Sequence, residues 1–368
     1  MTSGRSSAQE HILRSFFGKT RTELADVCQS VGSPGIHAAT LMTNAYKKLE
    51  SSPWTSGQLP KKLQALVSAE WEPHQMKIEK VLPSEYDGSV KFLVALKDGK
   101  HIEVVLMPEA RRITLCISSQ VGCNQACSFC YTGRMGLIRQ LEASEMVLQV
   151  VLANRWIKEN PDWLDRNRLP ASQKVTHIVL MGMGEPLDNV NNLIQAIKIL
   201  TEPRGLDFSP KRISVSTAGH LDGLKELTKA FPKIAIAFSL HAIDGKVRNR
   251  LMPINRRWPF QDVLEFLKQH FETHQPKGWF LIQYTLISKV NDDLEQAKSL
   301  ATLLKDLPVK VNLIPLNYID VSSFTSPEPD RLHQFRDVIH NAGIRVMIRY
   351  SKGQDISAAC GQLVISNK

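Results

Sequence analysis

The feature that most constrains the fold is a regular alternation of strand-like and helix-like patterns that begins near residue 112. Short apolar, β-branched runs predict strands at 112–118, 176–181, 212–217, 234–240, 279–287, 309–315 and 344–350. Segments of helical spacing lie between them, at 144–159, from 190, at 221–230 and 259–274, and from 293 and 329. This alternation is typical of an α/β fold with a parallel sheet, and the number of units predicts a full or partial (β/α) barrel.

Two smaller segments precede the barrel. Apolar residues recur at helical spacing within residues 10–70, and Phe16, Phe17 and Trp71 are expected in the core of this small domain. Residues 76–107 form strand-like runs separated by Asp-Gly turns, which predict a β-hairpin or meander. We therefore expect four parts: a helical accessory domain at 1–72, a β-extension at 73–111, the barrel at 112–350 and a tail at 351–368.

Composition limits the class of protein and its partners. The 368 residues are 43% hydrophobic and 22% charged, as in a globular protein. No apolar run approaches the roughly 20 residues of a membrane span, and the first 19 residues contain no apolar signal core, so we expect a soluble cytoplasmic protein. The net charge of +10 favours a polyanionic partner, with nucleic acid first, although a generic basic protein has the same charge.

Three cysteines lie within eight residues, spaced C-x3-C-x2-C, at Cys123, Cys127 and Cys130. Three thiolates this close can turn toward one point, and they are soft ligands suited to an iron–sulfur cluster or zinc. A cubane cluster held by three cysteines keeps one iron open for catalysis. The alternative is a closed zinc site completed by Cys116. Clustering of four of the six cysteines between 116 and 130 favours a metal site in a reducing compartment over a disulfide framework.

Polar and glycine-rich motifs follow several predicted strands. They are Met181-Gly-Met-Gly-Glu-Pro186, Ser216-Thr-Ala-Gly219, Ser239-Leu-His-Ala242 and Asn317. One such motif alone is an ordinary turn, but four at strand ends predict a cofactor cradle, because active sites of barrels lie there. A further cysteine, Cys360, lies among small residues after the last strand, where it is either a tail thiol without a role or able to reach the barrel mouth.

The cysteine triad, with Phe129 before its last member, resembles the radical S-adenosyl-L-methionine (radical SAM) superfamily. Further motifs narrow the resemblance: Thr114-Leu-Cys-Ile-Ser-Ser-Gln-Val-Gly-Cys123, Met-Gly-Met-Gly-Glu-Pro, Ser-Leu-His-Ala, Arg250-Leu-Met-Pro-Ile-Asn255 and Asp355-Ile-Ser-Ala-Ala-Cys-Gly-Gln-Leu363. Together they resemble the radical SAM methyltransferases of the RlmN/Cfr family, which methylate C2 of an adenosine in 23S ribosomal RNA and, in some members, in transfer RNA. The chain departs from the family at Arg139-Gln-Leu-Glu142, where Arg-Asn-Leu-Thr is usual.

The resemblance implies a partial (β/α) radical SAM barrel, a [4Fe–4S] cluster on Cys123, Cys127 and Cys130, and two molecules of S-adenosyl-L-methionine per turnover. It implies contacts to S-adenosyl-L-methionine from Gly184, Glu185, Ser216, Ser239, Leu240, His241 and Asn317. It also implies that 23S rRNA, with tRNA in some members, is the substrate, in the peptidyl-transferase region of the ribosome. A reductase such as flavodoxin would supply electrons, and no membrane is involved.

The resemblance also assigns roles to two cysteines outside the triad. Cys360 takes a methyl group, the methyl carbon adds to C2 of adenine as a radical, and Cys116 removes the C2 proton. A Cys116–Cys360 disulfide remains to be reduced. Glu103 matches the position of a carboxylate proton acceptor in the family. The alternative is that Glu103 is an exposed acidic residue on a strand without a catalytic role. Radical chemistry suits the reaction because C2 of adenine is electron-poor and does not attack a methyl cation donor.

Three questions stay open at the level of sequence. The same two cysteines serve the related antibiotic-resistance enzymes that methylate C8 of the same adenosine. A non-catalytic, zinc-stabilised RNA-binding protein would use Cys116, Cys123, Cys127 and Cys130 but leaves Cys360 unexplained. A basic run is expected either to hold RNA phosphates or to be an ordinary solvated face, and its members are Lys246, Arg248, Arg250, Arg256 and Arg257.

Overall fold

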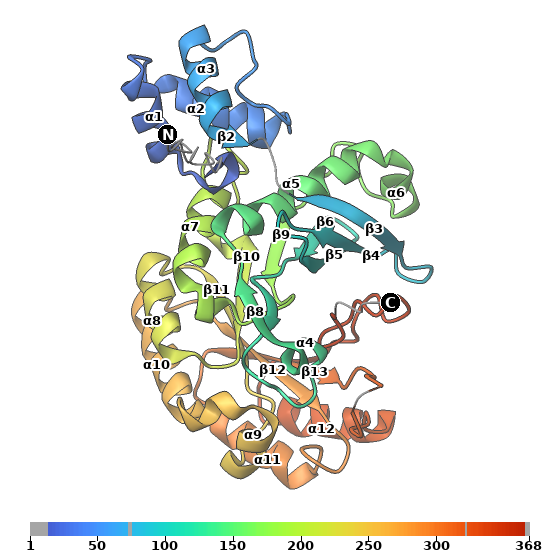
Figure 1. The fold of residues 1–368 in the computed structure, drawn as a ribbon. Helices are drawn as coiled ribbons and strands as arrows, with labels where there is room; N and C mark the ends of the chain where they lie inside the picture. Colours follow the sequence, from blue (N-terminus) through green and yellow to red (C-terminus); the bar gives the residue numbers. More distant parts are fainter. Residues whose placement is uncertain (1–13, 73–75, 321, 365–368) are drawn as a thin grey trace, which may run out of the picture.

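The protein is described by a computed structural model that covers residues 14–72, 76–320 and 322–364. Its centre is one ten-stranded sheet with the order β14-β13-β12-β11-β10-β9-β6-β5-β4-β3 (Figure 1). The parallel part consists of β6 (Arg112–Cys116), β9 (His177–Leu180), β10 (Ile213–Thr217), β11 (Ala235–Ser239), β12 (Phe280–Leu286), β13 (Val309–Pro315) and β14 (Val346–Ile348). Each of these strands was predicted, and the expected α/β partial barrel is confirmed.

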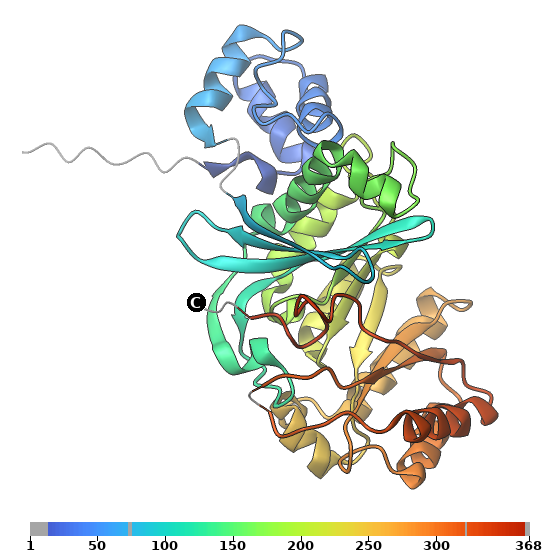
Figure 2. The same ribbon diagram turned by 90° about the vertical axis from the view of Figure 1, so that its right-hand side faces the viewer.

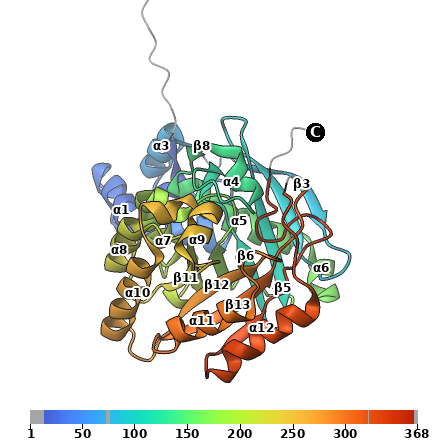
Figure 3. The same ribbon diagram turned by 90° about the horizontal axis from the view of Figure 1, so that it is seen from below.

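Helices cover the outer face of the parallel strands (Figures 1 and 3). They are α5 (Ala143–Glu159), α7 (Val190–Leu200), α8 (Leu221–Ala230), α10 (Phe260–His274), α11 (Leu294–Leu304) and α12 (Pro329–Asn341). Local sequence explains where they begin: the Asp293 side chain caps α11, and Glu142 and Glu145 form a capping box on α5. Two short helices, α6 (Pro161–Arg166) and α9 (Gly245–Leu251), lie in stretches for which no helix was expected.

The β-extension continues the barrel sheet. Its strands β3 (Lys77–Pro83), β4 (Val90–Ala95) and β5 (His101–Glu109) form an antiparallel meander, and β5 pairs antiparallel with β6. In Figure 2 the C-terminal segment, drawn in red, lies against this extension. Hydrogen bonds confirm the contact, because the Asp355 carboxylate accepts from the Ser84 hydroxyl and the Asp87 carboxylate accepts from the Gly353 amide.

The N-terminal part contains α1 (Arg21–Ser30), α2 (Ile36–Met42) and α3 (Lys61–Glu70). Phe16, Phe17 and Trp71 are buried in its core, as predicted. The two phenylalanines form a 3-10 turn rather than a helix, because a short strand, β1 (Arg14–Ser15), pairs with β2 (Trp71–Glu72) just before it. Residues 10–13 of the predicted helical segment lie outside the described residues.

A two-stranded hairpin that the sequence did not predict frames the cysteine loop. It pairs β7 (Gln120–Cys123) with β8 (Gly136–Gln140), and α4 (Tyr131–Met135) follows Cys130. Gly122, at φ +77°, is required here, because a Cβ atom would lie 1.9 Å from the Gly136 carbonyl oxygen. Within the described residues no helix is long and apolar enough to cross a membrane.

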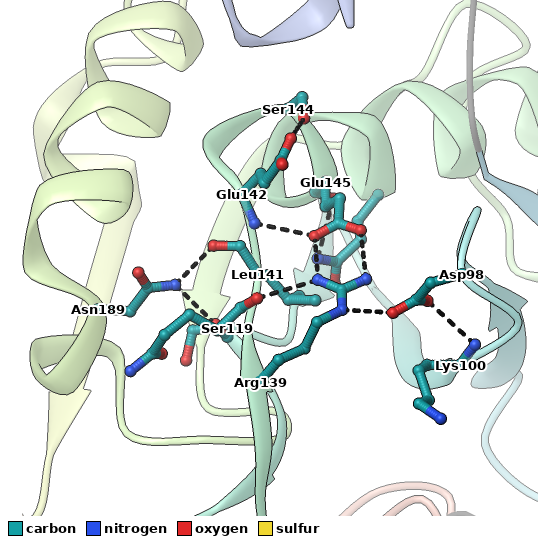
Figure 4. Close-up of polar contacts among 11 residues, drawn as sticks. Asp98, Lys100, Ser119, Arg139, Leu141, Glu142, Ser144, Glu145 and Asn189 are labelled. Carbon is teal, nitrogen blue, oxygen red and sulfur yellow. Dashed lines mark hydrogen bonds and ion pairs between the residues drawn. The ribbon is translucent and has the colours of Figure 1, made fainter. Parts of the chain in front are cut away.

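Side chains beyond the hairpin fix its position (Figure 4). The Arg139 guanidinium donates to both oxygens of Glu145, at 2.7 and 2.8 Å, and to Asp98 at 2.7 Å. Asn189 donates to the carbonyls of Ser119 and Leu141. The hairpin is therefore tied to the start of α5, to the β4–β5 turn and to the segment before α7.

Candidate active site

A cavity of about 160 Å³ lies at the carboxyl ends of the parallel strands. Most of the predicted site residues line it: Cys123, Cys127, Cys130, Gly184, Glu185, Ser216, Ser239, His241, Asn317 and Cys360. They come from the cysteine loop, from the turns after β9, β11 and β13, from the ends of β10 and β11, and from the tail. The structure thus brings together residues that are distant in sequence, at the end of the barrel where such sites form.

The three triad cysteines form one wall of this cavity and fit an iron–sulfur cluster. Burial raises the pKa of Cys123 to about 12 and also raises the pKa of Cys127 and Cys130. Buried thiols of this kind are deprotonated only when a nearby cation stabilises the thiolate. The iron of a cluster bound by these cysteines would supply that positive charge. Gly133 lies close to the loop, since a Cβ there would be 2.9 Å from the Cys127 amide nitrogen.

The structure does not fit the alternative four-cysteine zinc site. Among the described residues, no group of three or more His, Cys, Asp and Glu side chains is arranged to hold a single metal ion. The three triad cysteines nevertheless line one cavity, where each could ligate a different iron of one cubane cluster. Cys116 lines a different cavity from the triad, whereas a structural zinc ion needs all four ligands around it.

The turn after β9 provides a buried carboxylate and a close backbone approach. Gly184 has φ +101°, and a Cβ there would lie 2.5 Å from the Gln120 Cβ atom. The Glu185 carboxylate accepts from the amides of Ala218, at 2.7 Å, and Leu187, at 3.2 Å. Burial raises the pKa of Glu185 to about 7. An ammonium group entering the cavity would favour the charged carboxylate, which fits the amino group of S-adenosyl-L-methionine.

Hydroxyl and amide groups from neighbouring strands form the floor of the cavity. Ser216 and Ser239 both donate to the Gln283 Oε1 atom, at 3.1 and 3.2 Å. Gln283 was not predicted as a site residue. Its signal was nevertheless present in the sequence, as an amide in the middle of the apolar strand β12.

His241 and Asn317 are fixed by main-chain contacts. The His241 Nδ1 atom accepts from the Thr285 amide at 2.8 Å, so the ring proton is on Nε2. Burial lowers the pKa of His241 to about 3, which keeps the ring neutral. The Asn317 side-chain amide donates to the Cys360 carbonyl at 2.9 Å and so links the end of β13 to the tail.

A second, smaller cavity contains the other two thiols. It measures about 30 Å³ and is lined by Cys116, Cys360 and Arg349, among others. Cys360 lines both cavities and is solvent-exposed, whereas Cys116 is buried. Burial raises the pKa of Cys116 to about 12, and the Arg349 guanidinium partly offsets this shift. All six cysteines are free thiols, so the Cys116–Cys360 disulfide implied by the resemblance is not found in this structure.

Two predicted site residues line neither cavity. The Leu240 side chain is buried in the core and lines neither cavity, and its carbonyl accepts from Arg248. Glu103 also lines neither cavity; instead of an exposed strand acid it is buried and ion-paired with Lys91. Its predicted role as a proton acceptor stays a prediction.

Arg248 does not belong to a basic surface. It is 1% exposed, and its guanidinium donates to the carbonyls of Leu240, Ala218 and Ser239. The expectation that it holds RNA phosphates is therefore wrong. The other members of the run, Lys246, Arg250, Arg256 and Arg257, are exposed.

Comparison with known proteins agrees with this geometry. The sequence model of the Radical SAM superfamily matches residues 117–301. A dual-specificity RNA methyltransferase RlmN from Desulfotalea psychrophila is 38% identical over 94% of this chain and 93% of its own length. Another from Pseudomonas entomophila is 41% identical over 76% of this chain and 71% of its own. A radical SAM methyltransferase from Sphaerobacter thermophilus has a similar crystal structure, with a TM-score of 0.86 at 36% identity, over 95% of this chain and 98% of that one.

The partial barrel with three cysteines at its mouth defines a radical SAM enzyme, whose cofactors are a [4Fe–4S] cluster and S-adenosyl-L-methionine. Within that class, the chain belongs to the RlmN family of dual-specificity RNA methyltransferases.

Proposed function

We propose that this protein methylates C2 of an adenosine in the peptidyl-transferase region of 23S ribosomal RNA, and an adenosine in transfer RNA. The single observation that carries the proposal is the position of Cys360, which lines both the cavity of the triad and the cavity of Cys116. One thiol can thus face the source of the methyl group on one side and a proton-accepting thiol on the other. The printed names of the relatives, which describe dual-specificity RNA methyltransferases, support RNA as the substrate.

The cofactors and the chain divide the work. When bound, the cluster and S-adenosyl-L-methionine supply a methyl group and a radical that abstracts hydrogen. Cys123, Cys127 and Cys130 would hold the cluster, and Glu185 would bind the ammonium group of S-adenosyl-L-methionine. Ser216 and Ser239, oriented by Gln283, would bind its other polar groups.

Cys360 and Cys116 have different roles in this proposal. Cys360 carries the methyl group and presents its carbon to C2 of adenine, which becomes covalently attached to the protein. Cys116 then removes the C2 proton. The sulfur–carbon bond of the adduct would break as a Cys116–Cys360 disulfide forms; the electron pair stays on the carbon, which takes up a proton to become the methyl group, and the disulfide is then reduced. Arg349 beside Cys116 partly offsets the burial that raises the pKa of this thiol. A reductase such as flavodoxin would supply electrons, and the reaction would take place in the cytoplasm.

The nucleoside product tests the proposal against C8 methylation. Purified protein reconstituted with iron, sulfide, S-adenosyl-L-methionine and a reductant is incubated with 23S rRNA fragments or with tRNA. Digestion and mass spectrometry against both standards should identify 2-methyladenosine. Detection of 8-methyladenosine would instead support the antibiotic-resistance activity. Cleavage of S-adenosyl-L-methionine without any methylated RNA would contradict the proposed substrate.

A further inference from the structure

A buried ion pair lies on the β-extension, on the same face of the sheet as Cys116. Lys91 on β4 pairs in register with Val105 on β5, and Val105 pairs with Cys116 on β6. Glu103 is two residues from Val105 and therefore faces the same side. The Lys91 Nζ atom lies 2.8 Å from the Glu103 Oε1 atom, and the two side chains are 9% and 6% exposed.

Both members of the pair bind the main chain of the tail, on opposite sides of Cys360. Lys91 donates to the Ser357 carbonyl at 3.2 Å, three residues before Cys360. The other oxygen of Glu103 accepts from the Val364 amide at 2.9 Å, four residues after it. We call residues 357–364 the Cys360 loop. Figure 2 shows the tail against the extension that supplies these two side chains.

The cysteine segment holds the opposite side of the loop. The Tyr131 amide donates to the Gly361 carbonyl at 2.8 Å, and the Thr132 hydroxyl donates to the Leu363 carbonyl at 2.6 Å. Since Asn317 also donates to the Cys360 carbonyl, the loop is bonded to three parts of the fold. Among the residues that the structure describes, only the Lys91–Glu103 pair binds both ends of the loop.

Stability alone does not explain a buried pair at this position. An apolar pair of similar volume usually stabilises a buried site as well as an ion pair does. An apolar pair could not, however, offer a donor to the Ser357 carbonyl and an acceptor to the Val364 amide. The opposite polarities of Lys91 and Glu103 match the two main-chain groups and so fix which residues of the tail lie between them.

We propose that Lys91 and Glu103 are positioning residues that hold Cys360 between the two cavities by binding both ends of its loop. The expected effect on methylation of Cys360 rests on the proposed function. The anchoring of the Cys360 loop is independent of that function, so the two claims can be tested separately.

Hydrogen–deuterium exchange on the full-length, cluster-loaded protein tests the anchoring. The double variant Lys91→Met/Glu103→Leu fills the site with apolar side chains and removes both contacts to the loop. Peptides covering 357–364 should exchange about tenfold faster or more, as expected for loss of two hydrogen bonds to charged groups. Barrel peptides should be unchanged. Should the double variant not fold, the single variant Lys91→Met should give the same effect at the Ser357 end of the loop.

Two variants serve as controls. Lys91→Arg keeps a cationic donor and should leave exchange of the loop as in the wild type. Glu79→Gln removes an exposed carboxylate on the same sheet, paired with His101 and Lys77 but without a contact to the tail, and should also leave the loop unchanged. The anchoring is wrong if the loop exchanges at the wild-type rate in a folded double variant, or if Glu79→Gln accelerates it equally.

A second measurement tests the consequence for catalysis. The fraction of Cys360 that carries a methyl group, measured by mass spectrometry of protein isolated from cells, should fall about tenfold in the double variant. Iron content should stay at the wild-type level, which a general loss of structure would not allow. Wild-type protein without methyl on Cys360 would disprove the proposed function while the exchange result still decides the anchoring. Full methylation in a variant whose loop is released would disprove the positioning role.

Discussion

Burial determines the protonation of single side chains around the larger cavity. Glu185 and His241 are both buried, yet their pKa values move in opposite directions, to about 7 and about 3, because burial disfavours the charged form of each. The neutral His241 ring accepts from the Thr285 amide, and its backbone has φ +55°. Its role is therefore that of a fixed neutral group rather than of a proton carrier.

This protonation predicts a pH dependence of stability. Between about pH 6.5 and 3 the unfolded chain binds a proton at position 241 and the folded chain does not, so folding stability falls as the pH is lowered through this range. The contribution of His241 to the slope is about 1.4 kcal/mol per pH unit. His241→Asn keeps an acceptor and tolerates the positive φ. In urea unfolding at pH 5, 6 and 7.5, the free energy of unfolding should fall less steeply with decreasing pH in this variant than in the wild type. An equal fall in both proteins would contradict the prediction.

The two thiols of the smaller cavity should fail differently when replaced. Cys360→Ala has no methyl acceptor and should form no covalent species with RNA. Cys116→Ala retains Cys360 but lacks the base, so it should accumulate as a protein–RNA adduct on a denaturing gel of protein isolated from cells. Purely structural cysteines would give unstable proteins without an adduct. An adduct in Cys360→Ala, or normal turnover by Cys116→Ala, would show that the proposed assignment of roles is wrong.

At the scale of elements, the β7–β8 hairpin decides where the cysteine loop lies. Arg139 connects this hairpin to Glu145 on α5 and to Asp98 in the β4–β5 turn (Figure 4). The departure from the family at residue 142 does not disturb α5, because Glu142 and Glu145 form a capping box where threonine is usual, and the Glu142 amide donates to the Glu145 carboxylate at 2.8 Å. Hydrogen bonds to charged groups are among the stronger ones, so the hairpin depends heavily on Arg139.

Replacing Arg139 by Met should therefore loosen the cysteine loop. We expect a loss of roughly 1–3 kcal/mol in the free energy of unfolding and a lower iron content after reconstitution. Arg336→Met, which removes an exposed pair with Asp337, is the matched control and should change neither quantity appreciably. Full iron loading and unchanged urea unfolding of the Arg139 variant would show that the hairpin holds its place without this network.

Comparison of the predicted and observed elements shows which of them sequence patterns alone can predict. Local periodicity predicted the start of α7 and the bounds of α8 and β13, because each is determined by its own residues. The β7–β8 hairpin was missed because its strands are short and depend on distant partners of Arg139. Arg248 was misassigned to the surface for a similar reason: the carbonyls that bind it come from the ends of β10 and β11 and meet only in the folded barrel. Motifs at strand ends were better guides, since strand ends converge in every such barrel.

At the scale of the whole molecule, the net charge of +10 suits a polyanionic substrate. Four residues of the basic run remain exposed near the barrel mouth after Arg248 is excluded, namely Lys246, Arg250, Arg256 and Arg257. If they hold phosphates, log affinity for RNA should fall with log salt by about 0.7 for each contact with a single strand.

Neutralising Arg256 and Arg257 to Ser should lower that slope by about 1.4 in titrations across 50–300 mM salt. Lys298→Ser serves as control, because Lys298 lies on α11 in an exposed pair with Glu295. If the slope of log affinity against log salt does not change when both arginines are replaced, the basic run does not contact RNA phosphates and is an ordinary solvated face.

The position of Cys360 after every strand of the barrel has a consequence for biosynthesis. A ribosome translates the triad more than two hundred residues before it reaches the thiol proposed to carry methyl. The strands that bind the Cys360 loop, β4 and β5, are translated earlier still. The cysteine triad and the side chains that bind the loop are therefore present in the nascent chain well before Cys360 is added. A nascent chain interrupted at that stage would have the residues for radical formation but no Cys360 to receive a methyl group, so methylation of RNA would begin only once translation has passed residue 360.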